Sequence, residues 1–518
     1  MFLKGRTFSG GKAVATSFGA LLVLMPIISL KSGGWFLATL FFFRYISLSS
    51  TVGAIAAFCY TFHYGLPLAW KITIGILLVA IIYKHKRNYL RIISGKEPRV
   101  RSLVDIIKKL IGVYEKTWPV VRVSILVHAI TIEDAKQIWI ARIFYWLYKK
   151  KVISEKFLKK IALLGRLLED HHISGVQVPD GRRIESRLFG MTALAEQLME
   201  RVTKEEMEAK LAEEAERTGA PKKDLPAKLP FRHQAIIDDR LKAFAVLSAE
   251  FGANSGVLAA LTSSVAPKGG LEIQQWITKE GLPLTITNGA TATTAALIHA
   301  LRQKRPNLDE LIIAIVGGEG MIALGATVYL EQKYGKNPKP GFKIINVAHS
   351  KKIEPNSQIV LSTTDLSLIR EASIVVLATS SPYPIIIPEN AHYLAPGALV
   401  ADVAVPVDFD DQILLIRPDI EMFRAGMMLA PGNYRSDVDL HFPYVGSFPL
   451  LPACFVEGMI IALEMVDQSR PHPLATASGR VYPDKVDEYL RLFEKYNFRV
   501  VISQVSEGAV FSGQGGTQ

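Results

Sequence analysis

Cys454 is the residue whose position in the sequence best suits a nucleophile. It follows the run Pro449–Ala453, which contains two prolines, and it precedes the apolar run Phe455–Leu463. Because proline stops a helix from extending upstream, the pattern predicts that Cys454 lies at a helix N-terminus. The helix dipole there stabilises a thiolate and lowers the pKa of the thiol, which favours covalent chemistry on an acyl group. An inert, buried cysteine is the alternative interpretation.

Other residues near Cys454 could take part in the same chemistry. Glu457, one helical turn further on, could position the cysteine or cap the helix. Collapse of a covalent intermediate requires a general acid, and His441 and Tyr444 are candidates by their proximity in the sequence. The N–H groups of the helix could stabilise an oxyanion. The second cysteine, Cys59, lies in an apolar run, where a packing role is expected.

A glycine-rich turn predicts a nucleotide site. The apolar strand Leu311–Val316 runs into Gly317-Gly318-Glu319-Gly320, and a helix is predicted over Ala323–Tyr334. Glycine lets the backbone approach a pyrophosphate, and the N-terminus of the helix supplies N–H groups and positive potential. The spacing Gly-x-x-Gly-x-x-Ala, from Gly317 to Ala323, is a variant of the dinucleotide-binding motif.

The segments that follow continue an alternation of strands and helices. Buried strands are predicted over Phe342–Val347, Ser373–Ala378 and Ala398–Val403. Thr379 and Asp402, at the ends of two of these strands, are further candidates for contact with the cofactor. The alternation predicts a parallel, Rossmann-type α/β domain.

The turn after the second strand indicates which nicotinamide cofactor is used. An acidic residue at the end of this strand would bind the ribose 2′-hydroxyl of NAD. The strand ends instead in Ala348-His349-Ser350-Lys351-Lys352, and the first carboxylate is Glu354. Hydroxyl and cationic groups suit a 2′-phosphate, so His349, Ser350 and Lys351 favour NADPH. The alternative is that these are ordinary exposed loop residues.

Composition and charge limit the class of protein. The chain has 518 residues, a hydrophobic content of 49% and two cysteines, which excludes a disordered chain and a disulfide-framed secreted scaffold. The net charge of +12 is concentrated in residues 1–100, which hold twelve Lys and Arg and one acid. Because this region is also apolar, the charge is expected to flank membrane spans rather than to bind nucleic acid. No metal site is expected.

Apolar runs predict a multi-span helical membrane region over Val14–Leu30, Gly34–Phe43, Thr51–Phe62 and Leu68–Tyr83. A span needs roughly 20 apolar residues, so the two middle runs are predicted to be broken or half-length helices. A cleaved signal peptide is the alternative for the first run. The basic cluster Lys84-His85-Lys86-Arg87 predicts an inner (cytoplasmic) membrane protein whose following chain, with the catalytic domain, is cytoplasmic.

Four parts are expected along the chain. Residues 1–100 form the membrane region, and residues 101–300 form a substrate domain with a charged insertion near 203–230. Residues 301–440 bind NADP, and residues 441–518 carry the cysteine helix. The predicted fold class is an α/β Rossmann-type NADP-binding domain plus an α/β substrate domain, preceded by an α-helical multi-span membrane region.

Several blocks in residues 1–100 resemble the PlsY-type acyl-phosphate:glycerol-3-phosphate acyltransferases. Phe8–Gly19 is similar to the second conserved block of that family. His85–Arg91 with Gly95–Pro98 is similar to the third, and Arg44–Leu48 fits between them.

This resemblance implies that Lys12, His85, Asn88 and Arg91 belong to a phosphate and acyl site. The Gly-Gly-Lys turn that ends at Lys12 offers N–H groups and an ammonium to a phosphate. The other three residues recur at helical spacing and could share one face. The family's first block is not found ahead of the second, and Ala13 replaces a glycine. We therefore expect a membrane anchor that still contacts acyl chains.

Residues from about 122 to 505 resemble the long-chain acyl-[acyl-carrier-protein] reductases. The segment Pro452–Met459, around Cys454, is similar to the nucleophile segment of that family. Further similar blocks are Gly181–Ser186, Leu282–Thr294, Val316–Ala326 and Ala398–Asp402.

The second resemblance implies NADPH-dependent reduction of an activated long-chain acyl group to a fatty aldehyde through a Cys454 thioacyl intermediate. The implied partners are an acyl carrier protein or CoA thioester, the lipid bilayer and an aldehyde-consuming enzyme, and acyl-phosphate is a further donor to test. Two alternatives stay open. One is a glycerol-3-phosphate acyltransferase with a regulatory nucleotide-binding domain, and the other is a non-catalytic sensor of NADP and acyl chains.

Overall fold

The computed structural model divides the chain into two compact units, residues 1–117 and residues 118–518, which are described separately. The structure describes residues 21–22, 24–43, 45–93, 120–129, 139–165, 168–218, 224–226, 229–349, 357–436, 444–445, 448–465, 472–475 and 480–504.

The first unit is helical. Its described helices are α2 (Pro26–Phe43), α3 (Ile46–His63) and α4 (Leu68–Ile93). The second apolar run, Gly34–Phe43, was predicted to be a broken or half-length helix, but it lies in the continuous helix α2, which passes through Lys31-Ser32-Gly33-Gly34. The hydroxyl of Ser32 donates to Ser29 O at 3.1 Å and the Lys31 ammonium donates to the Tyr64 hydroxyl at 2.6 Å. The polar side chains therefore find partners without interrupting the helix.

Small residues let these helices approach one another. A Cβ added at Gly53 of α3 would lie 3.2 Å from Phe36 Cβ on α2, and one at Gly75 of α4 would lie 3.2 Å from the Phe58 ring on α3. Small residues serve this purpose in membrane helix packing. Within the described residues, Ile46–His63 and Leu68–Lys86 are long and apolar enough to cross a membrane by length and composition. Thr51–Phe62 was predicted to be short or broken, yet it lies in the continuous helix α3.

The second unit contains a mixed sheet in the strand order β12-β2-β3-β1-β4-β5. Strands β1, β3, β4 and β5 are parallel, and β2 runs antiparallel to β3. The strands are β1 (Val120–Ala129), β2 (Leu168–Gln177), β3 (Arg183–Leu194), β4 (Ser255–Leu258), β5 (Thr285–Thr287) and β12 (Arg435–Ser436).

A second sheet is parallel over six strands in the order β8-β7-β6-β9-β10-β11. Read along the chain, this is the order 3-2-1-4-5-6 of the doubly wound nucleotide-binding fold. Strands β15 and β16 pair antiparallel with β11. The strands are β6 (Ile312–Val316), β7 (Lys343–Val347), β8 (Val360–Thr363), β9 (Ile374–Leu377), β10 (Leu399–Asp402), β11 (Glu421–Leu429), β15 (Leu451–Pro452) and β16 (Arg499–Gln504). The expected α/β sheets are confirmed.

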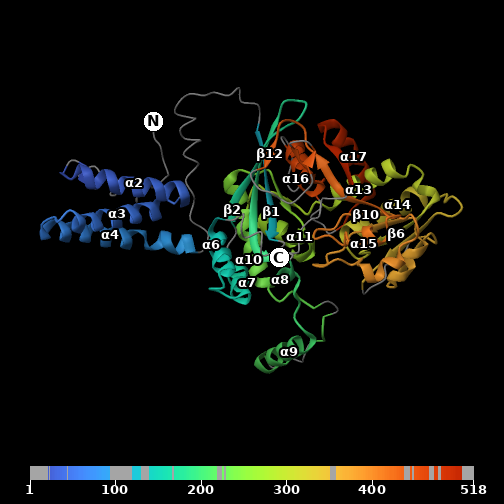
Figure 1. Ribbon diagram of the computed structural model, residues 1–518, viewed down its shortest axis with the longest axis horizontal. Coiled ribbons are helices and arrows are strands. Elements are labelled where there is room, and N and C mark those ends of the chain that lie inside the picture. The colour runs from blue at the N-terminus through green and yellow to red at the C-terminus, as the bar shows by residue number, and fades with distance from the viewer. Residues whose placement is uncertain are drawn as a thin grey trace. The chain divides into compact units, whose positions relative to one another are not determined.

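Helices α13 (Ala290–Lys304) and α16 (Ala453–Glu464) lie between the two sheets (Figure 1). Both are buried along most of their length, and α16 packs on β1, β4 and β11. A Cβ at Gly458 of α16 would lie 2.2 Å from Val257 Cγ2 of β4, so the glycine permits this close packing. Strands β12, β15 and β16 and helix α16, all late in the chain, therefore contribute to both sheets and to the core between them.

The remaining helices cover the outer faces and the sheet ends. They are α6 (Trp139–Lys149), α7 (Glu155–Leu164), α8 (Ala195–Met199), α9 (Lys204–Thr218), α10 (Gln234–Phe251), α11 (Leu261–Val265), α12 (Leu271–Lys279), α14 (Met321–Tyr334), α15 (Ile413–Ile416) and α17 (Pro483–Tyr496). The charged insertion forms α9, which projects away from both sheets (Figure 1). Its start is a capping box, with Thr203 N bonded to Glu206 and Glu206 N bonded to the Thr203 hydroxyl.

A buried ion pair organises the end of β10. Asp402 is 1% exposed and accepts hydrogen bonds from Asp408 N at 3.0 Å and Phe409 N at 3.1 Å. The same carboxylate accepts from Arg424 Nη1 on β11, and Arg424 Nη2 donates to Asp411 at 2.8 Å. Burial raises the pKa of Asp402 to about 6, and the Arg424 charge opposes this shift.

We expect Arg424→Met to lower the free energy of unfolding of the second unit by about 3–5 kcal/mol, because it leaves the Asp402 carboxylate buried without a charged partner. The measurement is the melting temperature of the detergent-solubilised full chain, followed by intrinsic fluorescence. Lys339→Met is the matched control, since its pairs with Asp309 and Glu310 are exposed and such pairs contribute about 0–1 kcal/mol. Equal melting temperatures for both variants would contradict the structural role.

Candidate active site

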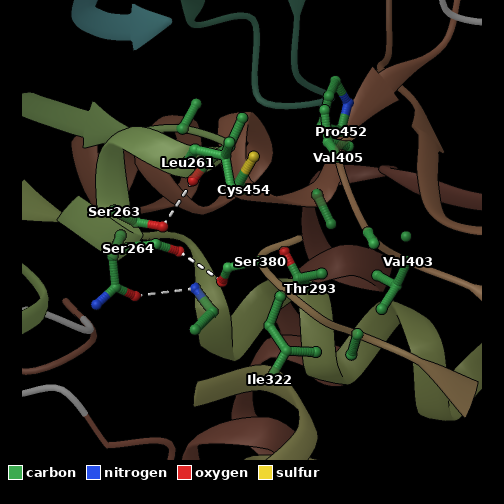
Figure 2. A pocket seen from close by; sticks show the side chains of 18 of the residues that line it. Leu261, Ser263, Ser264, Thr293, Ile322, Ser380, Val403, Val405, Pro452 and Cys454 are labelled. Carbon is green, nitrogen blue, oxygen red and sulfur yellow. Dashed lines mark hydrogen bonds between the residues drawn. The ribbon is translucent and has the colours of Figure 1, made fainter. Parts of the chain in front are cut away.

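A cavity of about 160 Å³ joins the two sheets of the second unit. It is bounded by β1 and α11 on the side of the first sheet and by the N-terminus of α14 and the loop after β9 on the side of the second. Ser264 of α11 and Ser380 of that loop face each other across it, with a hydrogen bond of 2.9 Å between their hydroxyls (Figure 2). Its lining side chains include Cys454.

Cys454 is the second residue of α16, after the N-cap Pro452, as the prolines predict. Gly289, the N-cap of α13, has a φ of +75° and lies against it. A Cβ at Gly289 would lie 2.1 Å from Cys454 Cβ, so glycine is required here both for the turn and for the contact. The N-termini of α13 and α16 therefore meet at the cysteine.

Glu457 fixes that meeting point. Its side chain is fully buried, accepts a hydrogen bond from the Thr287 hydroxyl and accepts another from Ala292 N at 2.7 Å. The carboxylate thus binds the end of β5 and the first turn of α13, a favourable position for negative charge. Of the two predicted roles, positioning the cysteine helix fits these contacts, and Glu457 does not line the cavity.

The surroundings of Cys454 oppose the predicted lowering of its thiol pKa. Burial raises the pKa of the Cys454 thiol to about 12, and the nearby Glu457 charge adds to this shift. Hydrogen bonding by the backbone N–H groups of Ala260 and Phe455 opposes it. The cost of removing a thiolate from water therefore exceeds the stabilisation that the helix N-terminus supplies.

The turn before α11 links Cys454 to a histidine that the sequence reasoning missed. Ala260 has φ +50° and ψ −136°, an unusual conformation for a residue with a side chain. Its N–H bonds to Cys454, and the next N–H, that of Leu261, donates to His128 Nε2 at 3.3 Å. His128 lies at the carboxyl end of the parallel strand β1 and lines the cavity. A histidine at that end of an apolar strand is the signal that could have identified it.

The glycine turn lies where the motif predicts, between β6 and α14. Gly317 has a φ of +99°, and a Cβ there would lie 2.4 Å from Ala378 O. A Cβ at Gly318 would lie 1.9 Å from Asn346 Oδ1 on β7. Gly320 is the N-cap of α14 and lines the cavity, whereas Ala323 is buried inside the helix. The N-terminus of α14, where the first helical N–H groups have no partner within the helix, therefore borders the same cavity as Cys454.

The two candidates at the strand ends differ. Thr379 lines the cavity, and its N–H and hydroxyl donate to Asp408 at 2.8 and 2.6 Å. Asp402 was predicted to contact the cofactor, but its carboxylate faces the backbone of residues 404–409 and Arg424 and does not line the cavity. Asp402 instead binds the backbone of the loop that contains Asp408, and Asp408 in turn accepts the hydrogen bonds of Thr379.

Several predicted site residues lie outside the described part of the chain. These are Lys12, Ser350, Lys351 and His441. His349 is described and exposed, just after β7. The side chain of Tyr444 is also not described.

In the first unit, α4 carries the three helically spaced candidates. His85 is buried and Asn88 is partly buried, while the side chain of Arg91 lies outside the described set. The hydroxyls of Tyr89, next to Asn88, and Thr51 of α3 share a hydrogen bond that ties the two helices together. The structure therefore brings part of the acyltransferase-like block against α3, without showing a phosphate site.

Comparison with known proteins identifies relatives of the first unit. Residues 2–95 match the family model described as glycerol-3-phosphate acyltransferase. The glycerol-3-phosphate acyltransferase of Albidiferax ferrireducens is 39% identical over 99 residues, covering 18% of this chain and 44% of that protein. The crystal structure of PlsY (YgiH), an integral membrane glycerol 3-phosphate acyltransferase, is 32% identical and covers 19% of this chain and 48% of that one, with a TM-score of 0.18. The resemblance seen in residues 1–100 is confirmed, and the chain spans less than half the length of these relatives.

A distant likeness concerns the remainder of the chain. A 5,10-methylenetetrahydrofolate dehydrogenase from the silkworm Bombyx mori is 11% identical and covers 64% of this chain and 87% of that one, with a TM-score of 0.22. A likeness at this level carries no information about activity. The similarity to acyl-[acyl-carrier-protein] reductases stays a prediction.

We expect Cys454 to react slowly with iodoacetamide near neutral pH. With a thiol pKa of about 12, the thiolate fraction at pH 7.5 is roughly a thousandfold below that of a free cysteine. The measurement is the rate of carbamidomethylation of the peptide containing Cys454, by mass spectrometry, from pH 7 to 10, with glutathione as the reference thiol. A logarithmic rate that rises with pH throughout this range supports the buried thiol, whereas a plateau above pH 8 contradicts it.

Proposed function

We propose that residues 118–518 reduce activated long-chain acyl groups to aldehydes with NADPH, and that the first unit holds this reductase at the membrane. The observation that carries the proposal is the single cavity that borders both Cys454 and the N-terminus of α14. A cysteine nucleophile and a dinucleotide-type turn on one doubly wound sheet are the parts that such a reduction requires.

The α14 side of the cavity supports a nicotinamide cofactor through its glycine turn. The glycine turn has no room for side chains at Gly317 and Gly318, and the cavity reaches Gly320 and Met321. Backbone N–H groups at a helix N-terminus suit a pyrophosphate. Bound there, NADPH would supply the hydride. We propose NADPH rather than NADH because the segment after β7, His349-Ser350-Lys351, contains no carboxylate.

The chain's own residues would carry out the acyl chemistry. Cys454 Sγ forms a bond to the acyl carbonyl carbon, and the bond from that carbon to the carrier thiolate breaks. Glu457 holds the start of α16, so the sulfur keeps its position during the exchange. After hydride addition at the same carbon, the carbon–sulfur bond breaks and the aldehyde leaves. The thioester stage is suited to hydride acceptance because sulfur donates less electron density to the carbonyl than oxygen does.

The location at a membrane rests on the first unit. Its apolar helices α3 and α4 and the match to integral membrane relatives support an anchor in the bilayer. The twelve Lys and Arg of residues 1–100, several of them directly after the last apolar run, support a cytoplasmic second unit. The acyl donor would then be an acyl carrier protein, CoA or phosphate derivative from the cytoplasm, and the aldehyde would pass to an aldehyde-consuming enzyme.

We expect the purified full chain to oxidise NADPH and release hexadecanal when palmitoyl-CoA or palmitoyl-[acyl-carrier-protein] is added. Cys454→Ser should lower the rate by at least a hundredfold, because a serine hydroxyl is far harder to deprotonate. NADPH should be favoured over NADH by about ten- to a hundredfold, the contribution of one charge-assisted phosphate contact.

The assay follows absorbance at 340 nm together with the aldehyde, identified by mass spectrometry. Radiolabelled palmitoyl-CoA without NADPH should label the wild type but not Cys454→Ser. Full reduction by Cys454→Ser would remove the covalent step from the mechanism, and no reduction by the wild type with either donor would reject the proposal.

A second candidate is acyl transfer from an acyl-phosphate to glycerol-3-phosphate, with the second unit as a regulatory nucleotide-binding domain. The match of residues 2–95 to the acyltransferase family favours it directly. Lys12, His85, Asn88 and Arg91 would be its phosphate and acyl residues.

The second candidate requires transfer of palmitate from palmitoyl-phosphate to radiolabelled glycerol-3-phosphate by the full chain in detergent, and the reductase with a membrane anchor does not. The measurement is lysophosphatidate on thin-layer chromatography, with a full-length acyltransferase of the matched family as positive control. Lysophosphatidate that disappears in Lys12→Ala and His85→Ala would establish the second candidate.

A further inference from the structure

We propose that the α6–α7 hairpin, residues 143–164, docks on the surface of an anionic lipid bilayer, so that the second unit makes a membrane contact of its own. Helices α6 and α7 lie next to each other in that unit (Figure 1). The contact is distinct from the apolar helices of the first unit. It concerns the surface of the second unit and does not depend on which reaction the cavity carries out.

Large apolar side chains are exposed on this hairpin, with exposed fractions from 49% to 66%. They are Ile143 and Trp146 on α6, Val152 in the turn, and Phe157 and Leu164 on α7. The pair on α6 is one helical turn apart and the pair on α7 is two turns apart, so each pair shares one helix face. Elsewhere in the described second unit, large apolar side chains with this exposure occur singly or as the pair Leu415 and Ile416. A cluster of exposed apolar side chains marks a contact surface.

Lysines surround these apolar side chains. The exposed ones are Lys149, Lys150, Lys151, Lys156 and Lys160. Residues 143–164 contain six lysines and one acid, Glu155, which gives a net charge of +5. Exposed tryptophan and phenylalanine beside lysine are typical of a helix that lies in a membrane interface. The lysines add attraction to anionic lipid headgroups, so the charge of the hairpin is complementary to such a surface.

The turn between the helices carries a charge where glycine is usual. Lys151 has a φ of +57°, the left-handed conformation that ends many helices at a glycine. Its N–H donates to Tyr148 O at 2.8 Å, and Val152 N–H donates to Leu147 O at 2.9 Å. The strained position and the residue after it therefore present an ammonium and an apolar side chain to the outside. Strain of this kind is typical of functional positions.

The inner side of the hairpin is attached to the first sheet of the second unit. Leu158 of α7 is buried, and the hydroxyl of Thr192 on β3 donates to Ala162 O at 2.5 Å. The Gln197 amide donates to Lys159 O at 2.9 Å. The ammonium of Lys159 pairs with Glu155 and with Glu196 of α8, so this sixth lysine is engaged within the unit. The exposed apolar and basic side chains therefore project from a firmly held support.

An anionic bilayer suits both kinds of exposed side chain. The apolar side chains can enter the boundary between headgroups and acyl chains while the lysines stay among the headgroups. The first unit matches integral membrane relatives and contains helices long enough to cross a bilayer. Because the two units are covalently linked, the bilayer is present at a high effective concentration, and a weak surface contact is then sufficient for docking.

The test reports the environment of the hairpin in the full chain. Phe157→Cys is labelled with the fluorophore NBD in a background of Cys59→Ala and Cys454→Ala. The chain is placed in nanodiscs of phosphatidylcholine alone, or of three parts phosphatidylcholine to one part phosphatidylglycerol. We expect a blue shift of the NBD emission, and quenching by nitroxide-labelled lipid, with phosphatidylglycerol only. The control is Leu415→Cys, which is also strongly exposed but lies close to Asp410 and Asp411, and it should not respond to lipid composition.

A charge variant separates lipid docking from simple burial of the probe. One lysine near an anionic surface contributes about fivefold to binding, so Lys149→Gln, Lys150→Gln and Lys151→Gln together should weaken docking by about a hundredfold. Docking by the wild-type hairpin should also weaken with added salt. Lys333→Gln, Lys336→Gln and Lys339→Gln remove the same charge from other exposed positions and should leave the NBD response unchanged.

Three results would overturn the inference. One is the same NBD emission in both kinds of nanodisc. Another is emission that is already blue-shifted in detergent, which would mean that another part of the chain or a second copy covers the hairpin. The third is a response to an acidic acyl carrier protein in detergent but not to phosphatidylglycerol, which would make the occupant a protein. If Phe157→Cys lowers the melting temperature, the exposed Ile143→Cys takes its place.

The docking and the reductase fail separately. Palmitoyl-CoA reduction by the wild type without a lipid-dependent NBD response leaves the reductase standing and removes the docking. A response that requires phosphatidylglycerol and the three lysines, without reduction of palmitoyl-CoA, leaves the docking standing and removes the reductase.

Discussion

The buried carboxylate of Glu457 is the interaction on which the geometry of the active-site cavity depends. An ionised group with no exposure to water is stable only when its oxygens are bonded, and here the donors are Thr287 and Ala292. These bonds fix the beginning of α16 against the end of β5 and the first turn of α13. Gly289 can then contact Cys454. The N-termini of α13 and α16, which are far apart in the sequence, therefore meet at the cysteine.

The position of Glu457 also affects the ionisation of the Cys454 thiol. A fixed negative charge one helical turn from Cys454 and the dry surroundings both raise the pKa of the thiol. The helix N-terminus and the Ala260 N–H act in the opposite direction and are outweighed. The contacts of Glu457 therefore hold Cys454 in place as a neutral thiol. A neutral thiol is alkylated and oxidised more slowly than a thiolate. The proposed acyl chemistry of Cys454 therefore requires that the thiol lose its proton during the attack on the acyl carbon.

Local patterns allowed much of the fold to be predicted from the sequence. The apolar strand before Gly317 and the alternation that follows it predict a parallel α/β sheet, and the prolines before Cys454 predict its helix start. The position of His128 in the cavity wall could not be predicted, because its hydrogen bond to the turn before α11 exists only after β1 pairs with β4. Asp402 was misassigned because a strand-end carboxylate has the same sequence signature whether it binds a ligand or its own loop. The thiol pKa was misjudged because the dipole is local, whereas burial is a property of the whole fold.

The size of the cavity constrains how a long substrate could be handled. About 160 Å³ is below the 300–1,000 Å³ of common ligand pockets, so the described cavity encloses the reacting centre and not a long chain. Hydrogen bonds that join its walls across the sheets include that between Ser264 and Ser380, at 2.9 Å, and that from the Asn288 amide to Met321 Sδ, at 3.2 Å. A neutral hydrogen bond contributes only about 0.5–1.5 kcal/mol net. These two hydrogen bonds therefore contribute little to the separation of the walls, whereas Glu457 and the core around α13 and α16 hold the side that carries Cys454. We expect a long substrate to enter by separating the walls at Ser264 and Ser380 and not by moving Cys454.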